Sequence, residues 1–231
     1  MTNNEFVKYS PEEIFEIFKE QHRLASPLDP EADESYEITK ETTVSDLQCA
    51  QDLLPWKEWT EWLNSCYGID ATKDEWKNIV KPISKKTIWE VSHFISERAD
   101  KELIKPIKIL GTECLSAAVF LTIKKNLKKK GVDIGGIRPS TNIEEYLNDN
   151  DENFSALIEE ATLTGVHTFD ELSYGELKTE RVYKKWLDNF LPNFFYERRL
   201  KTGDIKTFRD LVNRIIENKK LGTTLTLCKK T

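Results

Sequence analysis

The sequence predicts a mainly α-helical protein, a multi-helix bundle of two packed helical subdomains with at most a minor strand pair. Three observations support this class. Apolar residues recur at spacings of three and four along several segments, the period of one face of a helix. A Ser or Thr followed by Glu three residues later, the pattern of a capping box, precedes several of these segments. The 231 residues include 9 Gly and 8 Pro, fewer than the turns of a sheet-rich fold usually need.

Helix starts are well marked in the first 100 residues. Ser10, Pro11 and Glu13 combine a capping residue, a proline at the first helical position and a capping-box glutamate. Residues 25–35 are acidic and proline-containing, which favours a loop, and residues 36–44 alternate weakly enough to form one short strand. Later helices in this part are predicted to begin at Pro55, Thr72 and Thr87.

The rest of the chain contains its most apolar helix. Pro106 favours irregular or extended backbone around it. Thr112 is expected to cap a helix that ends near Lys130, and its first half is apolar nearly all round, so we place helix 112–130 at the centre of the bundle. No internal repeat is evident. Further helices are predicted after Thr141, around 154–165, around 182–190 and after Thr207.

Charge changes sign in blocks along the chain. Residues 1–100 hold 11 Lys or Arg and 21 Asp or Glu, a net charge of −10, and residues 139–180 also carry −10. Residues 101–130 carry +6 and residues 181–231 carry +8. Such blocks either pair with one another or offer a face to an oppositely charged partner. We divide the chain after the first block into an acidic, Trp-rich helical subdomain, 1–100, and a helical subdomain, 101–231, with the central apolar helix and basic C-terminal helices.

Composition narrows the class of protein. The N-terminus has no basic start followed by an apolar run, so no signal peptide is expected. The longest apolar stretch, Cys114–Ile123, is shorter than the roughly 20 residues of a membrane span. The four cysteines lie far apart, which suits reduced thiols. We therefore expect a cytoplasmic protein with no membrane partner, and the Lys, Ile and Asn content suggests a bacterial source. The net charge of −6 argues against generic nucleic-acid binding.

One segment resembles a known family. Asp52-Leu53-Leu54 precedes an amphipathic helix, then Gly68-Ile69, a short helix with Trp76, and Thr87. This order is similar to the second half of acyl carrier proteins, over about a fifth of the chain. The resemblance implies a small four-helix unit. It implies no phosphopantetheine arm, because Leu53 stands where the family's Asp-Ser-Leu motif has the attachment serine.

A glycine loop before a predicted helix is the candidate ligand site. Gly135 and Gly136 let backbone N–H groups approach an anion near the positive end of that helix. Arg138 is a candidate clamp for a phosphate or carboxylate, with Ser140 and Thr141 as hydroxyl donors. The spacing matches neither a Walker A loop nor a dinucleotide-binding glycine pattern. The alternative is a plain turn followed by a helix cap.

No catalytic, metal or cofactor site is predicted. Cys114 lies in the first turn of a predicted helix, where a thiolate is stabilised, but no histidine base is near it in sequence. A buried, inert thiol is the simpler interpretation. No cluster of His, Cys, Asp or Glu has the spacing of a zinc or two-metal site, and adjacent acids such as Glu159-Glu160 are expected to be solvated.

Tryptophan is concentrated in the first subdomain. Trp56, Trp59 and Trp62 fall on one predicted helix. Their functional interpretation is a partner-binding face, since Trp is frequent in binding hot spots. The alternative is that they fill the core of the subdomain.

The segment 181–220 interleaves basic and aromatic residues, a pattern typical of proteins that bind single-stranded nucleic acid. The alternative is a solvated helix face that the acidic block upstream neutralises. The candidate contact residues are Lys184, Lys185, Arg198 and Arg199.

The absence of a catalytic signature favours a non-enzymatic interaction or regulatory protein that acts on a protein partner, without a cofactor, through a charged or Trp-lined surface. Two alternatives stay open. One is an anion-binding or phosphate-binding protein or enzyme that uses the Gly135-Gly136-Arg138 loop. The other is nucleic-acid binding through residues 181–220.

Overall fold

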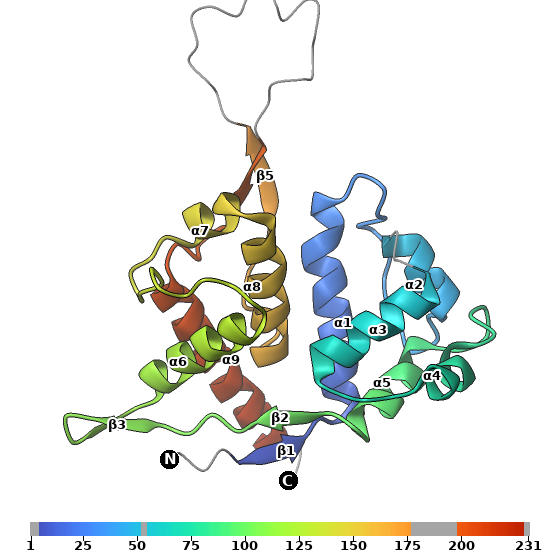
Figure 1. Cartoon of the computed structure of the whole chain (residues 1–231), viewed down its shortest axis with the longest axis horizontal. Helices are drawn as coiled ribbons and strands as arrows, with labels where there is room; N and C mark the ends of the chain where they lie inside the picture. The colour runs from blue at the N-terminus through green and yellow to red at the C-terminus, as the bar shows by residue number, and fades with distance from the viewer. Residues whose placement is uncertain (1–4, 52–54, 177–197, 229–231) are drawn as a thin grey trace, which may run out of the picture.

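The computed structural model describes residues 5–51, 55–176 and 198–228 (Figure 1). The chain is mainly α-helical, as predicted: 54% of it is helix. The expectation of at most one strand pair is wrong, because the described residues form three antiparallel two-stranded sheets. Each strand is only three or four residues long.

The first half of the chain follows the predicted helix starts closely. The capping boxes at Ser10, Thr72 and Thr87 are all present. Gly68 ends its helix in the left-handed conformation, with φ of 62°. Instead of forming a strand, residues 36–44 lead into a helix that the sequence analysis missed. The elements are β1 (Phe6–Lys8), α1 (Pro11–Ala25), the 3-10 turn η1 (Ser26–Leu28), α2 (Val44–Gln51), α3 (Trp56–Tyr67), α4 (Lys73–Val80) and α5 (Ile88–Ser96).

The second half departs from prediction at the apolar helix. Thr112–Cys114 pairs with Ile107–Ile109 as a hairpin, so the helix starts at Leu115. One side of this helix is open to solvent, because Leu121 is 52% exposed, whereas Val119, Ile123 and Leu127 are buried. The predicted helix 182–190 lies outside the described residues. The elements are β2 (Asp100–Glu102), β3 (Ile107–Ile109), β4 (Thr112–Cys114), α6 (Leu115–Lys129), α7 (Ile143–Asp149), α8 (Asp151–Thr164), β5 (Ser173–Glu176), β6 (Arg198–Lys201) and α9 (Phe208–Cys228).

The two halves repeat one arrangement of hydrogen bonds. In the first half, Thr43 and Thr87 form an isolated antiparallel bridge. The Val44 N–H donates to the Lys86 carbonyl oxygen at 2.8 Å, and the Ile88 N–H donates to the Thr42 carbonyl oxygen at 2.9 Å. Asn142 and Thr207 form the same bridge in the second half, with the corresponding bonds at 2.9 and 3.2 Å. Each bridge therefore ties together the starts of two helices, α2 and α5 in one half and α7 and α9 in the other.

A short sequence similarity accompanies this repeated arrangement of hydrogen bonds. Residues 86–95 and 206–215 align without a gap, and both begin Lys-Thr and end in Ile. Most of their buried positions coincide, since Val91 and Leu211 are both buried, as are Ile95 and Ile215. The long first helix of each half packs on this segment, α1 on α5 and α6 on α9. Each half thus buries its apolar residues against the same pair of elements.

Two groups of helices meet through α1 and α8, which run side by side in the middle of Figure 1. Buried apolar residues form two clusters, one within residues 14–99 and one that joins Leu24 to residues within 119–215. The clusters exchange side chains at this contact. Leu24 of α1 belongs to the second cluster, while Leu163 and Val166 pack against the first.

The bridge threonines supply the first prediction. Thr87→Ala and Thr207→Ala each remove a capping hydroxyl, so each is expected to lower the free energy of unfolding by about 1 kcal/mol in urea denaturation. Thr112→Ala is the control, because Thr112 is exposed and caps no helix. A loss for only one of the two bridge variants would show that the two bridges are not equivalent.

Candidate functional site

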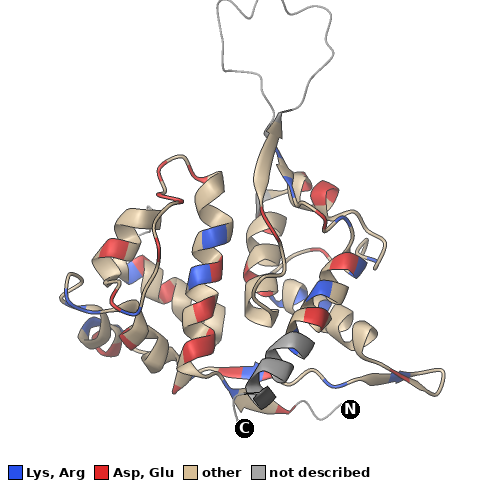
Figure 2. Ribbon diagram, turned by 180° about the vertical axis from the view of Figure 1, so that it is seen from behind, with Lys and Arg blue, Asp and Glu red and all other residues tan. Residues whose placement is uncertain are grey.

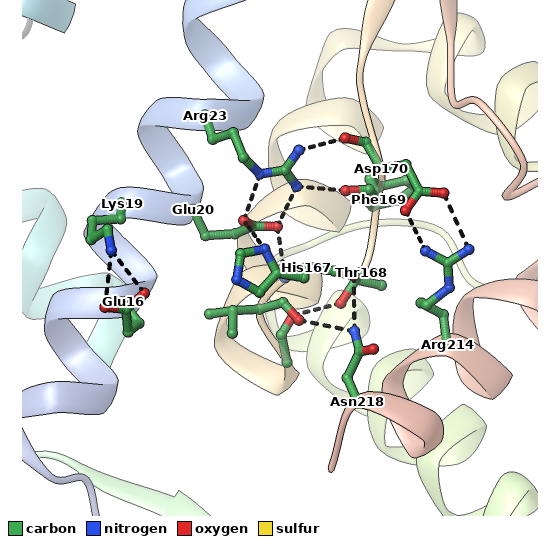
Figure 3. Close-up of polar contacts among 12 residues, drawn as sticks. Glu16, Lys19, Glu20, Arg23, His167, Thr168, Phe169, Asp170, Arg214 and Asn218 are labelled. Atoms are coloured by element: carbon green, nitrogen blue, oxygen red, sulfur yellow. Dashed lines mark hydrogen bonds and ion pairs between the residues drawn. The ribbon is translucent and has the colours of Figure 1, made fainter. Parts of the chain in front are cut away.

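A buried carboxylate lies at the contact between the two halves (Figure 3). The Glu20 side chain on α1 is 1% exposed. Arg23, one turn later on the same helix, donates to it from Nε at 2.9 Å and from Nη2 at 2.8 Å. This two-pronged geometry is the strongest common form of an Arg–carboxylate pair. The pKa of Arg23 is raised, chiefly by these hydrogen bonds to Glu20.

The same pair grips the backbone that follows α8. Arg23 donates from Nη1 to the Asp170 carbonyl oxygen and from Nη2 to the Phe169 carbonyl oxygen, both at 2.5 Å. In return, the backbone N–H of His167 donates to Glu20 Oε1 at 2.9 Å. His167 adopts a φ of 57°, a conformation that non-glycine residues rarely take. The contacts to α1 hold the chain in this turn.

Helix α9 holds the other side of the turn. Asn218 Nδ2 donates to the carbonyl oxygens of Val166 and His167, at 3.1 and 2.8 Å. Arg214 forms a second two-pronged pair, with the Asp170 carboxylate, at 2.5 and 3.2 Å. Hydrogen bonding to Arg214 lowers the pKa of Asp170. Residues 166–170 are therefore clamped between one helix of each half.

This arrangement positions chain segments, and it engages both oxygens of the Glu20 carboxylate in hydrogen bonds within the protein. Both oxygens of Glu20 are occupied, and its distance of 3.4 Å from His167 Nδ1 is the only acid–histidine contact in the cluster. A general base needs a free lone pair aimed at a substrate. The sequence did offer a signal that we missed, because Glu20 falls in the apolar stripe of α1 between buried Ile17 and Leu24. A charge in such a stripe requires a partner.

A second buried acid lies nearby on α8. Glu160 is 3% exposed, which corrects the expectation that the Glu159-Glu160 pair is solvated. Its Oε1 accepts from Asn126 Nδ2 at 2.7 Å and from Thr164 Oγ1 at 2.9 Å. Burial raises the pKa of Glu160, because the charged form loses its hydration. Glu159 instead pairs with Lys130 of α6.

Part of the polar groups of the glycine loop form hydrogen bonds within the loop itself. The N–H of Gly135 donates to the Asp133 carboxylate at 2.8 Å, where an anion would need it. The Thr141 hydroxyl lies 2.8 Å from the Arg138 N–H and 3.3 Å from the Gly136 carbonyl oxygen.

The helix after this loop is also unsuited to an anion. Asn142, not Thr141, caps α7, and the first turn of α7 is acidic. Arg138 and Ser140 are exposed. The loop is thus an ordinary turn and cap in this structure, and its interpretation as an anion site gains no support.

The tryptophans divide between core and surface. Trp59 is 3% exposed and packs beside Phe18, so it cannot line a binding face, and its assignment as a partner-binding residue is wrong. Trp56 and Trp62 are half-buried on the same helix. Lys81 lies over the Trp56 ring at 5.5 Å. A Trp-lined surface is therefore reduced to Trp56 and Trp62.

The basic segment falls mostly on residues that the structure does not describe. Lys184 and Lys185 lie outside the described residues. Arg198 and Arg199 begin β6, and Arg199 is exposed. Arg199 pairs in register with Gly175 of β5. The nucleic-acid interpretation therefore rests on sequence alone.

Cys114 differs from the buried, inert thiol that we expected. It is half-buried at the end of β4, as the cap of α6. Its Sγ lies 3.3 Å from the Ser116 hydroxyl, and hydrogen bonds from Ser116 and from the Ala117 backbone lower its pKa. Its contacts include no histidine. The thiol is more acidic than usual and has no base beside it.

Neither sequence nor structure links the chain to a known protein. No family model, no curated protein and no solved structure matches it. Across the described part of the chain, no three His, Cys, Asp or Glu side chains are grouped to hold a metal ion. Nor does any described helix have the length and apolar character to cross a membrane. The function must therefore be argued from the chain's own surfaces.

The clamp at Glu20 gives a prediction about stability. Arg23→Met leaves Glu20 buried without its counter-charge, so the free energy of unfolding should fall by about 2–3 kcal/mol in urea denaturation. Lys19→Met is the matched control. It breaks the exposed Lys19–Glu16 pair on the same helix and should cost roughly 0–1 kcal/mol. Equal losses for both variants would refute a special role for Arg23.

Glu160 gives a prediction about pH. Its folded pKa is raised above the unfolded value, so its contribution to stability is greatest below the unfolded pKa and is lost as pH rises through the folded pKa. Glu160→Gln keeps the acceptor oxygen for Asn126 and Thr164 and removes the charge. The variant is expected to gain stability over the wild type between pH 5 and pH 8. Unfolding curves at both pH values test this, and a constant difference would contradict it.

Proposed function

We propose that the protein is a non-enzymatic interaction or regulatory protein that binds another protein through exposed apolar and charged side chains. The two buried carboxylates, Glu20 and Glu160, are both held by internal hydrogen bonds, which favours a structural role for them. The glycine loop uses its own polar groups, so the alternative of an anion-binding protein or enzyme has less support. A cytoplasmic location belongs to the same proposal.

The β3–β4 hairpin is the observation that carries this proposal. It extends away from the helices, as Figure 1 and Figure 2 both show. Its turn presents Ile109, 44% exposed, and Leu110, 102% exposed. Leu110 also has a φ of 49°, a backbone conformation that costs free energy for a residue other than glycine. An extended apolar tip of this kind is typical of a contact made with a partner.

Two other surfaces that the sequence predicts to bind a partner contribute less to this proposal. Trp56 and Trp62 keep part of their rings exposed on α3, so they extend the proposal to a second, smaller face. Arg199 is exposed on β6 and adds a positive charge to the surface of the second half.

We also propose that the halves are subdomains, each a small helical bundle, divided near residue 101. The two apolar clusters and the repeated bridge support this division. The boundary runs through a structured connection, because β2 pairs with β1, with Phe6 opposite Glu102 and Lys8 opposite Asp100.

Capture of a partner from an extract of the source organism tests the function. The bait proteins are the wild type, the double variant Ile109→Ser/Leu110→Ser, and the control Phe6→Ser/Tyr174→Ser. The control removes two side chains that are similarly exposed elsewhere. We expect a protein, identified by mass spectrometry, that the wild type and the control retain and the hairpin variant loses. Identical sets of captured proteins for all three baits would reject the proposal.

A further inference from the structure

We infer that the contact between the end of α3 and helix α8 is a proton-sensitive device between the two halves, closed while the Glu160 carboxyl carries a proton and loosened when that carboxyl ionises. This α3–α8 contact consists of Cys66 and Tyr67 from the first half and of Glu159 and Glu160 from the second. The inference concerns how the halves are held together, so it goes beyond the proposed function and does not rest on it.

Side chains of both halves meet directly in the α3–α8 contact. Burial raises the pKa of the Cys66 thiol well above its usual range, and the negative charge of Glu159, which also forms a hydrogen bond with this thiol, raises it further. The Glu159 carboxylate pairs at the same time with Lys130 of α6. One turn later on α8, Leu163 packs against the apolar cluster of the first half. A change at this point of α8 therefore reaches both halves.

The Glu160 carboxyl is less well compensated than the other buried acid, Glu20. Glu20 accepts two hydrogen bonds from the positively charged guanidinium of Arg23. Glu160, which is 3% exposed, accepts from two neutral groups, the amide of Asn126 and the hydroxyl of Thr164. Neutral donors replace only part of the hydration that a buried carboxylate loses. Ionisation of Glu160 is therefore unfavourable as long as the contact keeps water away.

Charged and titratable groups face Glu160 from every element around it. They are Tyr9 before α1, Cys66 on α3, Lys130 on α6, Glu159 on α8 and Lys219 on α9. Lys130 is already paired with Glu159, and desolvation lowers the pKa of Lys219. Together with burial, which is the largest cause, these surroundings raise the pKa of Glu160. The closed contact thus favours the protonated carboxyl.

A buried hydroxyl without a partner makes the same contact easier to loosen. Among the described residues, nothing forms a hydrogen bond with the Tyr67 hydroxyl, although it is buried at the end of α3. The Tyr67 ring lies edge-on to Tyr9 of the same half, with 6.0 Å between the ring centres. A buried hydroxyl in this state costs free energy, and water would satisfy it once the contact loosens. Ionisation of one carboxyl therefore acts on a contact that is not strongly favoured.

The sign of the pH dependence follows from proton linkage. The pKa of Glu160 is raised in the closed contact, and access of water would return it towards its ordinary value, so the closed form binds the proton more tightly. The closed form is favoured most at low pH and loses this advantage as pH rises through the raised pKa. The clamp between Arg23 and Glu20 does not involve this proton, so the loosening stays local to the α3–α8 contact.

Hydrogen exchange of the full chain, measured by mass spectrometry, tests the inference. Amide protection is compared at pH 5 and pH 8, after correction for the intrinsic effect of pH on exchange. A difference of one pKa unit between the two forms changes their ratio by about tenfold. We expect the protection of residues 60–67 and 155–164 to fall by about threefold or more from pH 5 to pH 8, while α4 keeps its protection.

Two variants assign the response to one carboxyl. Glu160→Gln has no proton to lose and still offers an acceptor oxygen to Asn126 and Thr164, so its protection should be the same at both pH values. Glu152→Gln is the matched control, because it neutralises an exposed glutamate on the same helix and should keep the response of the wild type. Circular dichroism and urea denaturation establish that each variant is folded.

Three results would overturn the inference. Wild-type protection that does not change with pH shows that ionisation of Glu160 leaves the contact intact. A response that survives in Glu160→Gln belongs to another group. A response of residues 155–164 without one of residues 60–67 is a change within the second half alone. The hairpin takes no part in these measurements, so the capture experiment decides the proposed function separately.

Discussion

The relation between the two halves depends on one buried carboxylate. Glu20 lies where α1 meets the second half, and water cannot hydrate it there. Burial of a charge is tolerated only when hydrogen bonds and an opposite charge replace the lost water. Arg23 supplies the opposite charge, and Arg23 and the N–H of His167 supply the hydrogen bonds. Arg23 also donates hydrogen bonds to the carbonyl oxygens of Phe169 and Asp170. The requirement of a single acid thus fixes the path of a loop that is distant in sequence.

The repeated bridge shows how a small motif organises each half. A capping residue normally satisfies the N–H groups of its own helix. Here the cap residues of two helices also pair with each other, so the start of α2 is fixed against α5 and the start of α7 against α9. The bridged segments carry the buried residues that α1 and α6 cover. The bridged helix starts and one long helix therefore contribute in the same way to the core of each half.

Surface and interior chemistry are separated in this protein. The buried carboxylate of Glu160 accepts hydrogen bonds from neighbouring side chains. The most exposed large apolar side chain of the described residues lies instead on the hairpin, where Leu110 is 102% exposed. This separation is what directs the functional proposal to a docking surface rather than to a reaction centre.

The sequence by itself determined the helical class and the helix starts at Ser10, Thr72, Thr87 and Thr207, because these depend on neighbours within one or two turns. Tertiary structure decided what sequence spacing cannot express. Pairing with β3 turned Thr112–Cys114 into a strand. Trp59 is buried beside Phe18, and the Gly135 N–H of the glycine loop donates to the Asp133 carboxylate. Arg23 and residues 167–170 are more than 140 positions apart, and only the contact of α1 with α8 brings them together.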